Sequence, residues 1–270
     1  MDNHRKELLR NIRITKLEKD INQIQWSQIS KDKKLTEEFI REFKYKVNWE
    51  FISSNQKLSE EFIREHKGLV EWDIISAYQI LSEDFIREFS SSVNWHMISN
   101  NQQLSEDFII EFEDKVDWPS ISQYQKISEN LIRKYNEKMS WYYISKIQAL
   151  SEELIRDFQN EVNWISISEH QYLSIDFIRE MQNKIHWPFL WQKIKFSDDE
   201  LIEFQFYIPW EHYFCLREAS CFILKKLITK TPFLSMDEFK SSHLNEVEYK
   251  EIEKKLKLIN MFKNKKTSYI

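Results

Sequence analysis

Glycine, proline and cysteine are all scarce in this chain, which has one glycine, four prolines and two cysteines among 270 residues. Folds rich in β-structure depend on tight turns that favour glycine, and Gly68 alone cannot serve many hairpins. Cys215 and Cys221 fit neither a disulfide framework nor the two close pairs of a zinc site, so we expect both to be reduced thiols. These shortages favour helices joined by polar loops.

Long apolar runs and excess positive charge are missing as well. No apolar run reaches the roughly 18 residues of a membrane helix, and the start of the chain, MDNHRKELLR, has no apolar signal core. The formal net charge of -5 gives no general attraction to nucleic acid or to an anionic membrane, since both usually recruit a basic surface. We therefore expect an intracellular protein with no membrane partner, for which nucleic acid is a disfavoured ligand.

Tryptophan supplies the organising signal of the sequence, because nine of the ten tryptophans recur at one spacing. Each interval is 23 residues, without insertion or deletion, and self-similarity at a fixed period is typical of repeat proteins. We predict that tandem repeats extend over residues 26–210. The nine positions are Trp26, Trp49, Trp72, Trp95, Trp118, Trp141, Trp164, Trp187 and Trp210.

Each repeat is expected to contain two short helices, as the unit at residues 81–103 illustrates. Ser82 is a favourable N-cap for the first helix, and the carboxylates that follow it suit the positive end of the helix dipole. The second helix is expected to begin at the residue before the tryptophan, which is a good N-cap in five units. Two prolines that directly follow a tryptophan support this start, because proline is tolerated in a first helical turn. These prolines are Pro119 and Pro188; the further first-helix caps are Thr36, Ser59, Ser105, Ser128, Ser151, Ser174 and Ser197, and the second-helix caps are Asn48, Asn94, Asp117, Ser140 and Asn163.

Helices of this length are too short to be stable alone, so their apolar faces must be buried between stacked repeats. Ile98, Ser99 and Gln102 follow Trp95 at helical spacing and share its face, which we expect to be the core face, with tryptophan as the largest buried side chain of each layer. The predicted fold is an all-α solenoid of two-helix repeats. Residues 1–25 are expected to form an amino-terminal helical cap, and residues 211–270 a carboxy-terminal helical cap that ends in a basic tail.

Two polar residues recur in the repeat, and each allows two interpretations. The glutamines can form a ligand-binding row, but a buried amide ladder that fixes the stacking is favoured, because an unpaired buried amide is costly. The arginines can form a phosphate track for RNA, yet a glutamate lies four residues before most of them, which favours local ion pairs. The glutamines are Gln56, Gln79, Gln102, Gln125, Gln148 and Gln171, and the arginines are Arg41, Arg64, Arg87, Arg133, Arg156 and Arg179.

Catalytic motifs are not found in the sequence. The histidines share no repeat position and no metal-ligand spacing, so we expect most of them on the surface or in loops. Paired carboxylates lie where capping and dipole effects explain them, and neither a glycine-rich phosphate loop nor a nucleophile motif is present. The prediction is a protein that is not an enzyme, with no cofactor and no metal site.

The positions that vary between repeats are the candidates for recognition, because the recurring positions hold the stack. In the second helix these are the second and sixth residues after the tryptophan, which lie opposite the core stripe. Their aromatic, Met and Asn side chains are typical of interaction surfaces, although they can instead pack against the neighbouring repeat. The predicted partner-binding residues are Phe51, Asn55, Ile74, Tyr78, Met97, Asn101, Tyr124, Tyr143, Ile147 and His170; the same columns also contain Ser120, Ser166, Phe189 and Lys193.

The unit LSEDFIREF, followed by VNW and an IS element, resembles the short tandem repeats in proteins of mimivirus-like giant viruses. The resemblance covers about residues 26–210. It implies no shared activity, but it implies a viral origin, with host cytoplasm or the virion as the location. The favoured hypothesis is a scaffold for protein–protein interaction, with a protein partner such as a host factor. The alternatives are a structural or assembly component of a viral particle and, third, an RNA-binding repeat protein.

Overall fold

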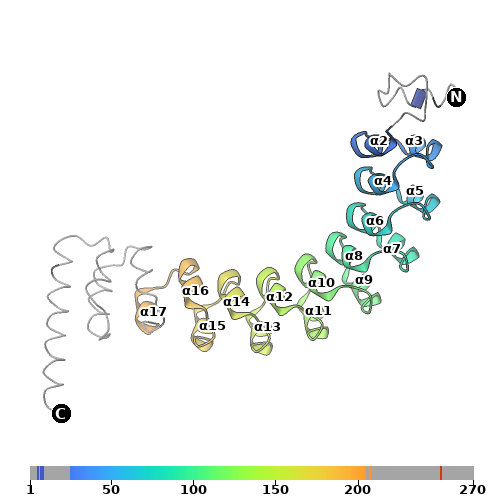
Figure 1. Cartoon of the computed structure of the whole chain (residues 1–270). Helices are drawn as coiled ribbons and strands as arrows, with labels where there is room; N and C mark the ends of the chain where they lie inside the picture. Colours follow the sequence, from blue (N-terminus) through green and yellow to red (C-terminus); the bar gives the residue numbers. More distant parts are fainter. Residues whose placement is uncertain (1–4, 6, 9–24, 205–206, 208–249, 251–270) are drawn as a thin grey trace, which may run out of the picture. The chain divides into compact units, whose positions relative to one another are not determined.

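A computed structural model describes residues 5, 7, 8, 25–204, 207 and 250, and every regular element within these residues is an α-helix. The chain divides into two compact units, residues 1–148 (unit 1) and residues 149–270 (unit 2). Two kinds of helix alternate along each unit (Figure 1). The predicted all-α architecture of stacked two-helix repeats is confirmed. Of the predicted caps, residues 1–25 and 211–270, all but residues 5, 7, 8, 25 and 250 lie outside the described residues.

Every even-numbered helix begins at a tryptophan and contains seven residues, and every odd-numbered helix contains six. Within unit 1, consecutive even-numbered helices contact each other. Unit 1 contains α2 (Trp26–Asp32), α3 (Glu37–Glu42), α4 (Trp49–Asn55), α5 (Glu60–Glu65), α6 (Trp72–Tyr78), α7 (Glu83–Glu88), α8 (Trp95–Asn101), α9 (Glu106–Glu111), α10 (Trp118–Tyr124), α11 (Glu129–Lys134) and α12 (Trp141–Ile147). Unit 2 contains α13 (Glu152–Asp157), α14 (Trp164–His170), α15 (Ile175–Glu180), α16 (Trp187–Lys193) and α17 (Asp198–Glu203).

Side-chain caps start the odd-numbered helices as predicted. The hydroxyl of Ser82 accepts a hydrogen bond from the backbone N–H of Phe85 at 3.2 Å, and each of the other expected serines and the threonine makes the equivalent bond. Most expected caps of the even-numbered helices are also confirmed, namely Asn48, Asn94, Asp117 and Asn163.

Ser140 is the exception among the expected caps, because it occupies the N-cap position of α12 without a side-chain capping bond. Its ψ angle is 97°, whereas Ser82, which does cap its helix, has a ψ of 154°. Asn94 caps α8 with a ψ of 107°, close to that of Ser140. At this backbone geometry the longer Asn side chain reaches the third N–H and the short serine hydroxyl does not.

Phenylalanine and isoleucine supply the fully buried core. In the third complete repeat Phe85 and Ile86 of α7 and Ile98 of α8 are 0% exposed. Burial of such a side chain contributes about 1.5–3 kcal/mol, and the contribution recurs in every layer. The equivalent residues include Phe39, Phe62, Phe108 and Phe177, Ile40, Ile63, Ile109 and Ile178, and Ile52, Ile75, Ile121, Ile144 and Ile167.

The tryptophans lie at the edge of this core, and the expectation that each is the largest buried side chain of its layer is wrong. The indole N–H is polar and needs an acceptor, which it finds in the turn between the two helices: Trp95 Nε1 donates to Ser90 O at 3.0 Å. The Trp95 ring packs against the phenylalanines, with its centroid 4.8 Å from that of Phe112. Trp118 and Trp187 are buried at 8% and 7% exposure, whereas Trp26, Trp49, Trp72, Trp95, Trp141 and Trp164 are only partly buried.

The glutamine column forms the buried amide ladder that the sequence favoured. Gln102 Nε2 donates to Ser76 O at 3.0 Å and to Gln79 O at 2.8 Å, and its Oε1 accepts from Leu81 N at 3.1 Å. Ser76 and Gln79 belong to the preceding repeat and Leu81 begins the repeat of Gln102 itself, so one side chain ties the two repeats together. Gln56, Gln79, Gln125 and Gln148 make the same three bonds, and Gln171 accepts the equivalent bond from Leu150 N.

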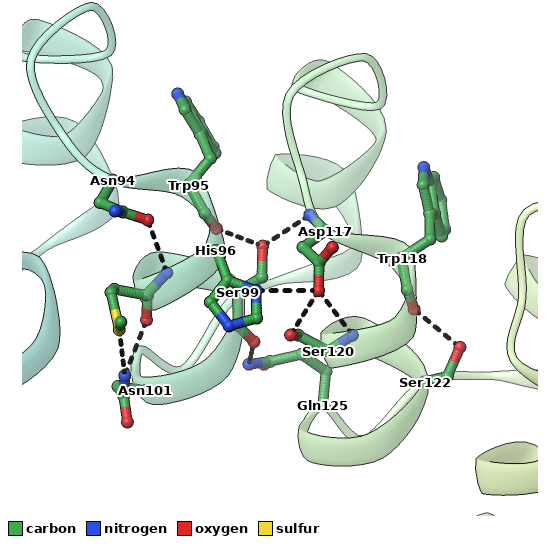
Figure 2. Close-up of polar contacts among 11 residues, drawn as sticks. Asn94, Trp95, His96, Ser99, Asn101, Asp117, Trp118, Ser120, Ser122 and Gln125 are labelled. Carbon is green, nitrogen blue, oxygen red and sulfur yellow. Dashed lines mark hydrogen bonds and ion pairs between the residues drawn. The ribbon is translucent and has the colours of Figure 1, made fainter.

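A buried serine makes a second link between repeats. Ser99 is 0% exposed, and its Oγ donates to Trp95 O at 2.7 Å. The same oxygen accepts at 2.9 Å from the backbone N–H of Asp117, the N-cap of the next even-numbered helix, α10 (Figure 2). The same acceptor role is played by Ser30, Ser53, Ser76, Ser122 and Ser168. The two links fix where each even-numbered helix lies against the next.

We predict that Trp118→Ala lowers the free energy of unfolding by about 3–5 kcal/mol, because it removes a buried ring and leaves the Glu113 carbonyl without its indole donor. Trp72→Ala should cost clearly less, since the Trp72 ring is only partly buried. Urea denaturation of the full chain, followed by circular dichroism, measures both. Equal losses for the two variants would show that the position of the ring at the core edge does not matter.

A second prediction concerns the amide ladder. Gln102→Leu should lower the free energy of unfolding by about 3 kcal/mol, because it leaves one N–H and two carbonyl groups without partners and each such group costs about 1–3 kcal/mol. The adjacent Gln103 is exposed, so Gln103→Leu is the matched control and should change stability by less than about 0.5 kcal/mol. A near-neutral Gln102→Leu would mean that the ladder does not hold the repeats.

Candidate functional site

The variable positions lie on the exposed side of the even-numbered helices. In unit 1 these helices form one row, on the inner side of the bend of this unit, and the odd-numbered helices form the other row (Figure 1). Ile98 and Ser99 of α8 are 0% exposed, so the side of α8 that bears them is turned into the core. The remaining side chains of each even-numbered helix are therefore the ones available to a ligand.

The structure separates the ten predicted binding residues into two groups. The six at the sixth position after the tryptophan are exposed, and the four at the second position are partly buried. Neighbouring repeats account for the second group: the Lys31 ammonium of α2 lies 5.7 Å from the centre of the Phe51 ring of α4. Exposed are Asn55, Tyr78, Asn101, Tyr124, Ile147 and His170; partly buried are Phe51, Ile74, Met97 and Tyr143.

The serines of the same two columns are not part of a surface. Ser120 and Ser166 are 4% and 5% exposed, and Ser120 Oγ donates to the Asp117 carboxylate at 2.5 Å. Phe189 and Lys193 of α16 are partly buried. The second position is thus partly or fully buried in every repeat named here. The sixth position is exposed at the six predicted residues and partly buried only at Lys193 among those named.

Sequence reasoning missed several large exposed side chains beside this face. Tyr142 and Ile165 directly follow their tryptophans and are 49% and 51% exposed, and Ile80 and Tyr172 lie in the loop after the helix and are 88% and 92% exposed. The loop residue eight positions after each tryptophan varies between repeats, as the sixth residue does. This variability could have identified the loop residue as a candidate for recognition. That loop position holds Lys34, Lys57, Ile80, Gln103, Lys126, Ala149, Tyr172 and Lys195.

The arginines of the odd-numbered helices are engaged in ion pairs. Arg64 Nε contacts Glu88 of the next odd-numbered helix at 2.6 Å, and Arg64 also lies 3.8 Å from Glu60, four residues before it. Its guanidinium lies 5.0 Å from the Phe85 ring centre. The predicted local pairs are confirmed, and the pair to the next repeat is an addition that the sequence analysis missed. Arg41, Arg87 and Arg156 make the same contacts, and Arg179 pairs with Asp176 and Glu203.

Hydrogen bonds to three glutamates lower the pKa of their carboxyl groups. The hydrogen bond from Arg41 lowers the pKa of Glu65, that from Arg179 lowers the pKa of Glu203, and that from Tyr135 lowers the pKa of Glu113. A general acid or base works best with a pKa near the operating pH, so these carboxylates are suited to pairing and not to proton transfer.

A histidine, an aspartate and a serine lie together between α8 and α10. His96 Nδ1 is 3.2 Å from Asp117 Oδ2, and the same oxygen accepts from both the hydroxyl and the backbone N–H of Ser120 (Figure 2). In a nucleophilic triad the imidazole contacts the serine hydroxyl, whereas here it contacts only the carboxylate. Burial acts to raise the pKa of Asp117, but the bonds from Ser120 and His96 outweigh it and lower the pKa. The cluster is a helix cap with an added histidine.

One histidine departs from the expectation that most lie on the surface. His66 is 3% exposed at a position where most repeats have an aromatic residue, and its ring stacks on Phe62 at 4.3 Å and lies 5.2 Å from Trp49. Its Nδ1 lies 3.0 Å from Phe62 O, and its buried Nε2 has no hydrogen-bond partner. This histidine replaces phenylalanine in the core and does not form part of the exposed face.

Within the part of the chain that the structure describes, no group of His, Cys, Asp or Glu side chains is arranged to hold a metal ion. Cys215 and Cys221 lie outside the described residues. Among the described helices, none combines the length and the apolar character required to cross a bilayer.

The lowered carboxyl pKa values predict an acid-labile fold. A carboxyl group whose pKa is lower in the folded than in the unfolded chain adds stability above its unfolded pKa, about 4.3 for glutamate, and this stability is lost as the pH falls through the folded pKa. The free energy of unfolding should therefore fall as the pH is lowered below about 4.3. Arg41→Gln should make that fall shallower by removing the partner of Glu65, with a loss under about 1 kcal/mol at neutral pH because the pair is exposed.

Urea titrations at a series of pH values test this prediction. Lys57→Gln is the control, because Lys57 is exposed and forms no ion pair with another described residue. Parallel pH profiles for the wild type and Arg41→Gln would contradict the role of this pair.

Comparison of the chain with protein-family models, with curated proteins and with solved structures finds no match. The viral resemblance of the repeat accordingly stays a prediction.

Proposed function

We propose that this chain is a non-enzymatic repeat scaffold that binds another protein through the exposed side of its even-numbered helices. One observation carries the proposal: large exposed side chains of mainly apolar surface recur on three even-numbered helices of unit 1, α6, α10 and α12. Tyr78, Tyr124, Tyr142 and Ile147 are 69%, 53%, 49% and 48% exposed. Aromatic and aliphatic groups that gather on one face, outside the core, are typical of protein-binding surfaces.

The row of odd-numbered helices does not favour RNA binding. The arginines that would have to contact phosphates are paired with glutamates of their own and of the next repeat, so a phosphate would have to displace those carboxylates. If the chain derives from a giant virus, as the repeat resemblance implies, a host protein is the first partner class to test.

Substitution of exposed tyrosines separates the two sides of the molecule. Tyr78→Ala and Tyr124→Ala should each weaken capture of a protein partner by about tenfold, as expected for aromatic residues central to an interface. Tyr45→Ala is the matched control, since Tyr45 is 82% exposed but lies in the turn after α3, on the other row. All three should change the free energy of unfolding by less than about 1 kcal/mol.

The measurement is affinity capture on the immobilised full chain, with unfolding measured separately for each variant. Capture that depends on Tyr45 and not on Tyr78 or Tyr124 would contradict the proposal. The assembly alternative has its own readout, because a particle component should self-associate with rising concentration in light scattering.

A further inference from the structure

Two contiguous grooves run along the edge of unit 1 where α2, α4 and α6 enter their following loops. The first is lined by residues 31–35 and 55–57, and the second by residues 54–58 and 78–80. Each has a volume of ≈ 370 Å³. Residues 55–57 line both, so the two grooves lie next to each other along this edge.

The first groove is strongly basic in a chain of opposite overall charge. Lys31, Lys33, Lys34 and Lys57 line it together with one acidic residue, Asp32, which gives a formal charge of +3. Lys33, Lys34 and Lys57 are exposed, and their ammonium groups form no ion pair with another described residue. The helix dipole explains a lysine in the last turn of α2, such as Lys31, but not Lys33, Lys34 and Lys57, which lie beyond the ends of their helices.

The second groove changes from basic to apolar. Beyond Lys57 it contains no cation, and its far side is formed by Tyr78 and Ile80, which are 69% and 88% exposed. Charge therefore gathers in the first groove and at the shared residue Lys57, and apolar surface lies at the far side of the second groove.

The floor of both grooves is held by the amide ladder. Gln56 is 5% exposed and Gln79 is 6% exposed, and their amides bind the backbone of the loops that form the walls, including Lys33 O at 2.8 Å and Leu58 N at 3.0 Å. A ligand thus meets loops that are already ordered, which lowers the entropic cost of binding.

We propose that these two adjacent grooves together bind an acidic, extended peptide segment of a protein partner, with carboxylates in the lysine groove and an apolar side chain between Tyr78 and Ile80. The proposal rests on the scaffold function above and names the partner chemistry at one part of the face. Helical repeats stack about 9–10 Å apart and an extended chain advances about 3.3 Å per residue, so the two grooves together accommodate about six peptide residues.

The distribution of charge favours a peptide over single-stranded nucleic acid. A nucleic acid carries a phosphate on every nucleotide and requires cations along its whole track. The lysines here all line the first groove, and the second offers Ser54, Asn55 and two apolar side chains. A peptide can match this division, because its acidic and apolar residues can occupy separate stretches.

Fluorescence anisotropy on the full chain tests the proposal. The probe is a fluorescein-labelled peptide in which a run of glutamates is followed by a leucine and a phenylalanine; the reference probes have glutamine in place of glutamate, or are an oligouridylate of equal charge. The acidic peptide should bind more tightly than both references. Added salt should weaken its binding, because exposed charges are screened.

Matched variants locate the site. The double variant Lys33→Glu with Lys57→Glu should weaken binding of the acidic peptide by at least about tenfold, and Tyr78→Ala by about fivefold with little dependence on salt. Lys126→Glu reverses a lysine at the loop position equivalent to Lys57, and Tyr124→Ala removes the tyrosine equivalent to Tyr78. Neither control residue lines either of these two grooves, and each control should change the affinity by less than about twofold.

Three results would overturn the proposal: no binding of the acidic peptide to the wild type, equal losses in the control and groove variants, or tighter binding of the oligouridylate with the same lysine dependence. Failure of the acidic-peptide site is distinguishable from failure of the proposed scaffold function. Tyr124 lies outside these two grooves, so capture of a protein partner that depends on Tyr124 would leave the scaffold function standing and remove only the acidic-peptide site.

Discussion

The three hydrogen bonds of each buried glutamine are the constraint on which the other features of the repeat depend. The amide of Gln102 must meet Ser76 O, Gln79 O and Leu81 N together, and it is 6% exposed, so water cannot replace a lost partner. An inserted residue between the tryptophan and the glutamine, or in the loop that follows, would separate the amide from these groups. This requirement explains why the period stays at 23 residues while the surface residues change freely.

In the ion pairs between successive odd-numbered helices, the two partners change together from repeat to repeat. Arg87 of α7 pairs with Glu111 of α9 at 2.8 Å. One repeat later, Ile110 takes the place of the arginine and Lys134 takes the place of the glutamate. Both members change together, so no glutamate is left facing an apolar side chain. The charge pairs adjust locally, whereas the glutamine bonds to backbone groups do not allow substitution on one side.

The sequence predicted the parts of the fold that follow from local chemistry. The caps, the start of each even-numbered helix at tryptophan, and the buried amides all depend on residues within one repeat and its neighbour. The burial of tryptophan was predicted wrongly for most repeats, because the prediction rested on ring size alone. The indole bond to the turn is common to the partly buried Trp95 and the buried Trp118, so it does not by itself set the depth of the ring. The grooves were not predictable, because they depend on how loops 31–35, 55–57 and 78–80 lie beside one another.

A net charge of -5 disfavours polyanions on the surface as a whole, but it does not describe any one part of that surface. Many carboxylates form ion pairs on the odd-numbered row, where Glu65, Glu88 and Glu111 each pair with an arginine of the preceding repeat. At the loop edge Lys33, Lys34 and Lys57 form no ion pair with another described residue, so their charges can attract a ligand of the opposite sign. Exposed charges interact over about 10 Å at moderate salt, roughly the spacing of one repeat, so recognition responds to this local excess and not to the total.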